Sequence, residues 1–308
     1  MANYFYEYLK GYKAFIMPLE LFDDITFKKV VFIINMIKII CSLNMVLATI
    51  AALGFISAPK YFNEKTYLLV WIFENFPTHS NIMAKFVHWT SLPVALVLAG
   101  TSLVWTYAGM NGVFQVALLK RMIATITTST IQHKYRRDSP LYQETTKQKM
   151  IICIMTHEIL VRYQNIACDL FEAPMMMFAM GSVVLGGALM IEFLSNQALD
   201  LGDQYTIYIG IVCFAMAGGI SAMLYLIIGQ VLKDESEACN YQLRQLPWYD
   251  MNSENMKIYS FFLLKTERCV SLSNSLIQLD CILLMRIIKA LYSIATLLAQ
   301  FVASNYSA

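Results

Sequence analysis

The sequence predicts an all-α fold, a polytopic membrane helical bundle with five apparent transmembrane helices and cytoplasmic helical extensions. Five apolar stretches are each long enough for a helix to cross a hydrocarbon core, which takes about 20 residues. They cover residues 31–57, 86–108, 171–194, 205–231 and 281–303. Hydrophobic residues make up 58% of the chain and charged residues 14%, a balance typical of a membrane bundle and not of a soluble domain.

The charges between the apolar stretches predict the orientation in the membrane. The loop 109–150 is rich in Lys and Arg, whereas the loop 195–204 holds Asp200 and Asp203 and no basic residue. By the positive-inside rule, the N-terminus and the loops 109–170 and 232–280 lie in the cytoplasm. Five crossings then place the C-terminus outside the cell, as expected of a multi-pass plasma-membrane protein.

Residues 1–308 are expected to form a single membrane domain with a cytoplasmic N-terminal arm over residues 1–29. Apolar residues recur at helical spacing from Lys149 to Leu194, which predicts one helix that begins in the cytoplasm and runs outward. The same periodicity predicts an amphipathic helix over 254–278 that leads into the last span. The run Gly218-Gly219-Ile220-Ser221 is expected to let neighbouring helices approach closely.

Several function classes are excluded by the sequence. The net charge of +2 gives no reason to expect a nucleic-acid partner. The four histidines are scattered over different loops and spans, and no phosphate-binding or metal-ligand spacing occurs. The seven cysteines include no CxxC pair, and none falls in an expected external loop. We therefore expect no enzyme activity, no cofactor and no metal.

Two motifs near the C-terminus carry a family resemblance. Residues 246–250 read Leu-Pro-Trp-Tyr-Asp after the fourth span. The last span holds Lys289, Tyr292, Ser293, Thr296, Leu297 and Leu298. The pair resembles the C-terminal signature of insect odorant receptors, a Trp-Tyr dipeptide after the penultimate helix and Lys-x-Ser-Tyr-Ser-x-x-Thr-Leu-Leu in the last one. Leu291 departs from the usual Ser, and the predicted orientation agrees with that of the family.

The resemblance implies an odorant receptor subunit in a ligand-gated, non-selective cation channel that senses volatile chemicals. The implied partners are a small hydrophobic odorant, membrane lipid and the shared odorant receptor co-receptor, in a heterotetramer. The family has seven spans and this chain matches the last five. We therefore expect the first two helices to be missing, through an incomplete gene model or a degenerate, non-functional locus, with a working five-span receptor as the alternative.

The last span is expected to line the pore, through Leu297, Gln300 and Phe301. Leu297 and Phe301 are four residues apart and share a helix face, with Gln300 beside them. An apolar ring can close a pore by dewetting, and a neighbouring amide can meet a hydrated ion. The alternative is that these are ordinary lipid-facing or helix-facing residues.

The ligand site is expected in the outer half of the bundle, where similar receptors hold odorants between helices. Tyr205 and Tyr208 lie at i, i+3 spacing at the start of the fourth span, Phe86 and Trp89 begin the second, and Met45 lies in the first. An apolar, aromatic cavity suits small hydrophobic ligands. The alternative is that the aromatic residues anchor span ends at the membrane interface.

Three other classes of protein are alternatives. A gustatory receptor has the same orientation, but its last helix carries the pattern Thr-Tyr-x-x-x-x-x-Gln-Phe. In this chain only the final Gln-Phe of that pattern is present, as Gln300-Phe301. A secondary transporter would show an internal repeat and interrupted helices, and neither is present. A membrane enzyme would need clustered His, Asp or Glu, which the spans lack.

Overall fold

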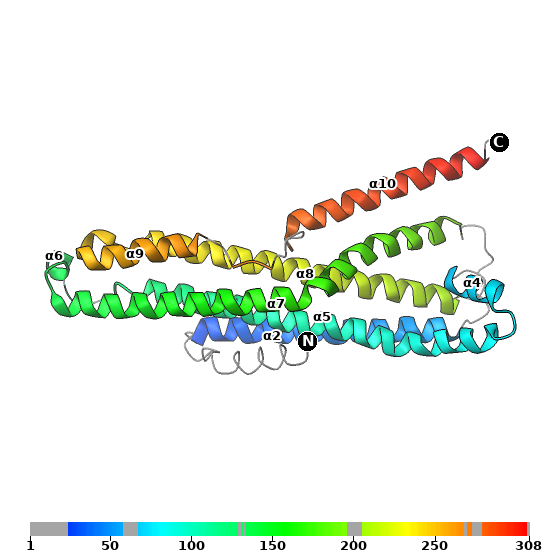
Figure 1. The fold of residues 1–308 in the computed structure, drawn as a ribbon, viewed down its shortest axis with the longest axis horizontal. Helices are drawn as coiled ribbons and strands as arrows, with labels where there is room; N and C mark the ends of the chain where they lie inside the picture. The colour runs from blue at the N-terminus through cyan, green and yellow to red at the C-terminus, as the bar shows by residue number, and fades with distance from the viewer. Residues whose placement is uncertain are drawn as a thin grey trace. The chain divides into compact units, whose positions relative to one another are not determined.

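The computed structural model describes residues 24–57, 67–128, 131, 133–195, 205–267, 270–272 and 279–306, without the side chains of 171–195, 205–207, 301–306 and a few single positions. All secondary structure in these residues is helical, which confirms the predicted fold class (Figure 1). The helices are α2 (Asp24–Ser57), α4 (Tyr67–Asn75), α5 (Ser80–Ala124), α6 (His133–Arg136), α7 (Pro140–Ser195), α8 (Tyr205–Arg244), the 3-10 helix η3 (Trp248–Asp250), α9 (Ser253–Thr266) and α10 (Cys281–Tyr306).

Within the described residues, three helices are long and apolar enough to cross a membrane, Thr26–Ser57, Ser80–Ala124 and Tyr208–Arg244. They contain the first two expected spans and nearly all of the fourth. The expected spans 171–194 and 281–303 are helical too, within α7 and α10. Most of the N-terminal arm lies outside the described residues.

The long helices extend well beyond the apolar stretches. Helix α8 continues past residue 231 to Arg244, and α7 begins at Pro140, earlier than the expected start at Lys149. Proline is favourable at the first helical position, because its missing N–H would have no partner there. The Ser139 hydroxyl oxygen accepts from the backbone N–H of Tyr142 at 3.4 Å, as an N-cap residue does.

The predicted amphipathic helix over 254–278 was too long. Helix α9 ends at Thr266, and residues 270–272 are not helical. The reason is a tertiary contact: the backbone N–H of Val270 donates to the Ser236 hydroxyl of α8 at 2.7 Å instead of to a carbonyl of its own helix. Leu272 is buried, so this segment is held against the body of its unit in a non-helical conformation.

The chain divides into two compact units. The first comprises Met1–Lys29, Thr106–Met176 and Leu226–Leu283, and the second Val30–Trp105, Met177–Tyr225 and Leu284–Ala308. Helices α5, α7 and α8 each contribute one part to each unit.

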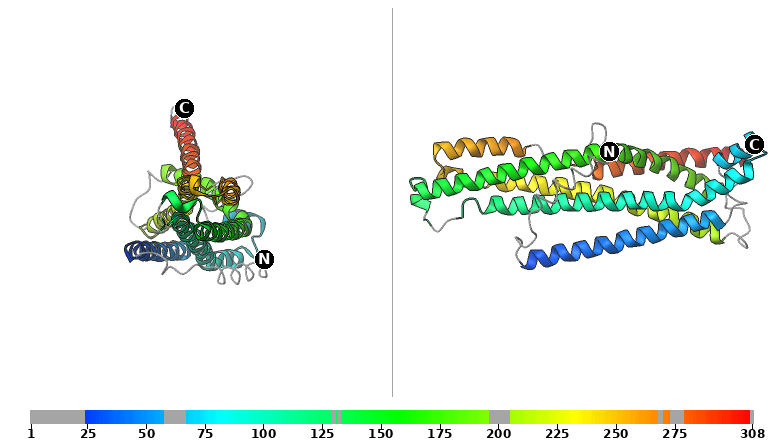
Figure 2. Two further views of the ribbon diagram at one scale, coloured as in Figure 1. Left: turned by 90° about the vertical axis from the view of Figure 1, so that its left-hand side faces the viewer. Right: turned by 60° about the horizontal axis from the view of Figure 1, so that its bottom comes forward.

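In the first unit, Gln143 of α7 connects the turn after α6 to η3 and α9. Its side-chain amide nitrogen donates to the carbonyl oxygens of Arg136 at 3.0 Å and Asp250 at 2.9 Å. Its amide oxygen accepts from the Asn255 side chain at 2.8 Å. Helix α9 accordingly runs beside α7 (Figure 2).

The Leu-Pro-Trp-Tyr-Asp motif lies at this junction, with its members in opposite environments. Asp250 is buried and pairs with Arg136 at 3.4 Å, whereas Trp248 and Tyr249 are exposed. Asp250 therefore ties η3 to α6 through Arg136, whereas Trp248 and Tyr249 remain on the surface.

His157 of α7 is a buried titratable side chain in the first unit. Its ring packs against Phe262 of α9 at 6.4 Å. Burial lowers the pKa of His157, the charge of Lys265 lowers it further, and Glu158 opposes the shift. The folded unit therefore favours the neutral ring. This contribution to stability is complete above about pH 6.5, the pKa of an unperturbed histidine, and is lost as the pH falls through the lowered folded pKa.

We predict that the melting temperature of the purified protein in detergent falls below about pH 6.5, and that His157→Leu reduces this fall. The substitution of the exposed His79 by Leu is the control and should leave the pH dependence in place. Melting curves between pH 5 and 8 test this. The same acid-induced fall in the His157→Leu variant and in the unaltered protein would contradict the assignment.

Candidate functional site

Three helices of the second unit, α2, α5 and α8, meet at a buried polar cluster. The Asn44 side-chain amide nitrogen of α2 donates to the hydroxyl oxygen of Ser102 on α5 at 3.3 Å and to that of Ser221 on α8 at 2.9 Å. All three residues are buried. Interhelical hydrogen bonds of this kind hold membrane helices in a defined register, because water is not available as a competing partner.

Small residues surround the polar cluster. Ala48, Ala99 and Ala217 form a buried group with Leu47, against which Met45 packs. The backbones of α2 and α8 also approach closely near one end of this interface. A Cβ added at Gly210 would lie 3.4 Å from the Cα of Gly54. This packing requires small side chains where the helices meet.

The run 218–221 contributes to packing differently from the prediction. A Cβ added at Gly218 or Gly219 would meet no atom of the described residues within 4 Å, so neither glycine permits a close approach to another described helix. Ala217 and Ser221 are buried instead. They lie four residues apart and share a face of α8, whereas the two glycines between them face elsewhere.

Aromatic residues gather near α4. The His88 ring of α5 lies 4.7 Å from the ring of Phe55 on α2. Leu69 and Ile72 of α4 form a buried cluster with Ala84 of α5, and Phe55 is among the side chains packed against it. Helix α4 therefore packs against the adjoining ends of α2 and α5, and His88 is turned inward beside this cluster.

The structure places the five predicted ligand residues in different environments. Met45 packs against the buried alanines, and Tyr208 is half-buried two residues before Gly210. Phe86 and Trp89 are 70% and 69% exposed, and so lie on a face of α5 turned away from the chain's own core. The side chain of Tyr205 lies outside the described residues. Contact of these residues with a ligand remains a prediction.

The predicted pore residues lie on α10, where Leu297 and Gln300 are exposed and the Phe301 side chain lies outside the described residues. Ser293 and Thr296 donate their hydroxyls to carbonyl oxygens of their own helix, those of Lys289 and Ser293, at 2.9 Å each. Ser293 and Thr296 thus have hydrogen-bond partners within their own helix, and the apolar side chain of Leu297 is exposed.

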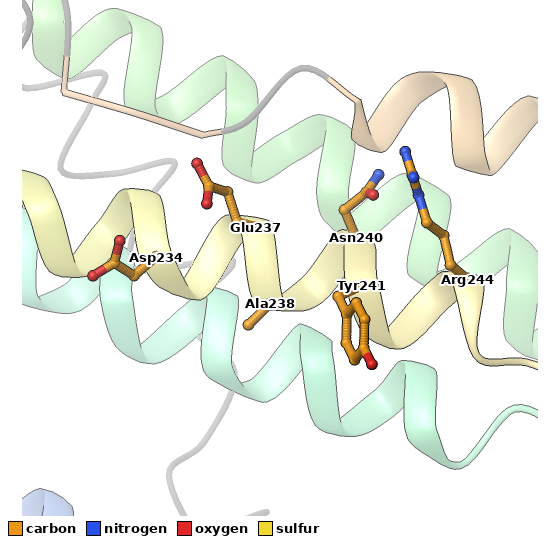
Figure 3. A pocket seen from close by; sticks show the side chains of 6 residues that line it. All are labelled: Asp234, Glu237, Ala238, Asn240, Tyr241 and Arg244. Carbon is orange, nitrogen blue, oxygen red and sulfur yellow. The ribbon is translucent and has the colours of Figure 1, made fainter.

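Within the described residues, no group of three or more His, Cys, Asp or Glu side chains could hold a metal ion. A shallow surface hollow lies along α8 (Figure 3). Its lining side chains, Asp234, Glu237, Ala238, Asn240, Tyr241 and Arg244, all come from this single helix. One helix cannot surround a small molecule, so we assign no ligand to this hollow.

Sequence reasoning missed Asn44, Ser102 and Ser221 as an interacting set. The available signal was the presence of polar residues inside three apolar stretches, since buried polar groups in a membrane need partners. Each stretch holds several polar residues, so this signal neither singles out these three nor pairs them.

A comparison with protein-family models matched residues 23–292 to the seven-transmembrane odorant receptor family. The chain belongs to the insect odorant receptor family. A search of curated proteins gave no match. The matched range of this odorant receptor includes the Leu-Pro-Trp-Tyr-Asp motif and extends into α10 as far as Tyr292. The family assignment favours an odorant receptor over the gustatory receptor, transporter and enzyme alternatives.

We predict that Asn44→Leu, which keeps a similar volume, lowers the thermal stability of this odorant receptor by about 1 kcal/mol, because two interhelical hydrogen bonds are lost. The loss is small since Ser102 still donates to the Ala99 carbonyl oxygen at 2.8 Å. Asn111→Leu is the matched control, because the Asn111 amide donates only to Tyr107 of its own helix among the contacts described. Equal melting temperatures for the two variants in detergent would contradict the cluster's role.

Proposed function

We propose that this odorant receptor chain is a subunit of a ligand-gated, non-selective cation channel in the plasma membrane, which assembles with the shared co-receptor as a heterotetramer. Family membership supports the receptor role. The channel role rests on one observation: several large side chains of the apolar helix α10, among them Tyr292 and Leu297, are exposed in the described part of the chain.

The exposed side chains of α10 support its place at a pore shared between subunits. Tyr292 is 70% exposed and Leu297 57% exposed. A single helix cannot enclose a pore, but the same face repeated around an axis by several subunits can. Leu297 and Phe301 would form the apolar constriction, and Gln300 would meet the hydrated ion beside it.

Exposed apolar residues on α9 support an association with partner subunits. Phe261 and Leu264 are 50% and 68% exposed on a helix that lies outside the expected spans. Large apolar residues clustered on a water-facing helix are typical of interaction surfaces. We assign these residues and α10 to contacts with the co-receptor.

The proposed ligand is a small hydrophobic odorant held between helices of the second unit. The candidates for contact are Met45, Phe86, Trp89, Tyr205 and Tyr208. Their apolar and aromatic character suits a volatile molecule that lacks strong polar groups. Tyr208 is the first choice, because it is half-buried beside the close approach of α8 to α2.

The proposed topology has the N-terminus in the cytoplasm and the C-terminus outside, and epitope tags test it. A tag after Ala308 should be stained on intact cells, whereas a tag before Met1 should be stained only after permeabilisation. The charge asymmetry of the loops is the physical reason. Staining in the reverse pattern would remove the proposed orientation, and with it the odorant-gated channel.

Substitutions in the subunit, expressed with the co-receptor, distinguish the proposed pocket from the proposed pore. Leu297→Ser or Phe301→Ser should hydrate the constriction, and leak current without odorant is expected. Gln300→Ala should change ion permeation more than odorant sensitivity. Whole-cell currents and reversal potentials measure both.

Tyr208→Ala should shift odorant sensitivity and leave permeation intact. Loss of one aromatic contact removes about 1–3 kcal/mol, which corresponds to a rise of roughly fivefold to a hundredfold in the half-maximal odorant concentration. If Tyr208→Ala changed permeation while Gln300→Ala changed only tuning, the assignments of pocket and pore would be wrong.

A further inference from the structure

One face of α8 carries a row of contacts to the segment that joins α9 to α10. Asn240 donates its side-chain amide to the Thr266 hydroxyl oxygen at 3.0 Å, and the Ser236 hydroxyl accepts from the backbone N–H of Val270 at 2.7 Å. The contact residues Gln230, Lys233, Ser236 and Asn240 recur at spacings of three and four residues. Residues so spaced lie on one face of a helix, so the described residues Thr266, Val270, Asp280 and Cys281 all contact that face of α8.

The row ends at the first turn of α10. The Gln230 side-chain oxygen accepts from the backbone N–H of Cys281 at 3.1 Å. Lys233 lies 3.7 Å from the carboxylate of Asp280, whose other oxygen accepts from the backbone N–H of Leu283 at 3.0 Å. Asp280 is therefore both the N-cap of α10 and the ionic partner of α8. Its side chain is buried, so the pair is not screened as a surface ion pair would be.

Gly229 brings the two backbones together at this point. A Cβ added at Gly229 would lie 2.8 Å from the Leu279 Cβ, and closer still to the Leu279 carbonyl oxygen. A backbone oxygen cannot move aside as the end of a flexible side chain can. The Leu279 backbone N–H is also fixed, since it donates to the Leu272 carbonyl oxygen at 2.9 Å. Only glycine fits at residue 229 without a shift of one backbone.

We propose that Gly229, Gln230 and Lys233 of α8 form a latch on Leu279, Asp280 and Cys281, and that this latch transmits movement of α8 to α10 during gating. The proposal rests on the proposed channel function, in which α10 lines the pore. Helix α8 is continuous from Tyr205 to Arg244. The candidate ligand residue Tyr208 and the latch are thus about 30 Å apart along one helix.

The latch residues are expected to affect gating although they contact neither the odorant nor the ion. Displacement of α8 by a ligand would move the Gly229–Leu279 contact and the Lys233–Asp280 pair together, because both lie within little more than one turn of the helix. Loss of either contact should weaken transmission and leave recognition unchanged. The order of potency among odorants should therefore stay the same while the response falls.

Two variants with a matched control test the proposal by electrophysiology. Asp280→Asn keeps a side-chain oxygen for the Leu283 N–H and removes the charge that faces Lys233. Gly229→Ala adds the Cβ that meets Leu279, and Gly218→Ala is the same change on the same helix where no atom lies within 4 Å. In subunits expressed with the co-receptor, we expect Asp280→Asn and Gly229→Ala to raise the half-maximal odorant concentration about fivefold and to lower the maximal current. Gly218→Ala should not lower the response.

Hydrogen–deuterium exchange tests the latch independently of current. The backbone amides of residues 279–283 should exchange faster in Asp280→Asn and Gly229→Ala than in Gly218→Ala, by about fivefold, in purified protein. If the unaltered subunit gave no odorant-evoked current, the channel function would fail, and the exchange data would still decide the latch. Unchanged exchange in both variants would overturn the latch itself. Faster exchange with unchanged currents would overturn its role in gating.

Discussion

The structure depends on α8 being one unbroken helix with two kinds of surface. Its first part is apolar and packs against α2 and α5 through Ala217 and Ser221. Its second part is polar and holds the chain before α10 through Gln230 and Lys233. In a membrane the backbone must satisfy its own hydrogen bonds, and a helix does so along its whole length. The two sets of contacts are therefore linked by a backbone with no break in hydrogen bonding, and a change in one can be transmitted to the other.

The presence and type of the helices could be predicted from the sequence because the membrane leaves few alternatives. Apolar stretches of sufficient length become helices, and the family motifs then fix the order of the elements. The ends could not be predicted in the same way. The second part of α8 lies beyond its apolar stretch, and the hydropathy signal stops there although the helix continues to Arg244. The early end of α9 depends on Ser236, a residue 34 positions from the Val270 that it contacts.

The candidate site was harder to predict, because residue type does not determine which face of a helix is buried. Trp89 and Phe86 are exposed, whereas His88 between them is buried against Phe55. Periodicity within a uniformly apolar stretch does not distinguish these faces. Asn44 has a defined role only through Ser102 and Ser221, which lie 58 and 177 positions away. The role of a glycine likewise depends on which distant residue lies against it. Leu279 lies against Gly229, whereas no described atom lies within 4 Å of a Cβ added at Gly218.

The exposed apolar side chains differ in what can cover them. The contacts among α2, α5 and α8 include a hydrogen-bonded polar cluster and closely packed alanines, all buried within the chain. Large apolar side chains are exposed on these helices and on α10, among them Trp89 and Leu297, and lipid can cover those that lie in the expected spans. Leu264 of α9 is also exposed, but α9 lies outside the expected spans. Assembly with other subunits would bury the exposed face of α9 and gain roughly 25 cal/mol for each Å² of apolar area removed from water. Helix α10 would associate instead through side-chain packing and interhelical hydrogen bonds, because lipid provides no hydrophobic driving force between helices. Lys233 and Asp280, which join α8 to α10, therefore lie between the cluster buried within the chain and a helix whose exposed side chains are available to partners.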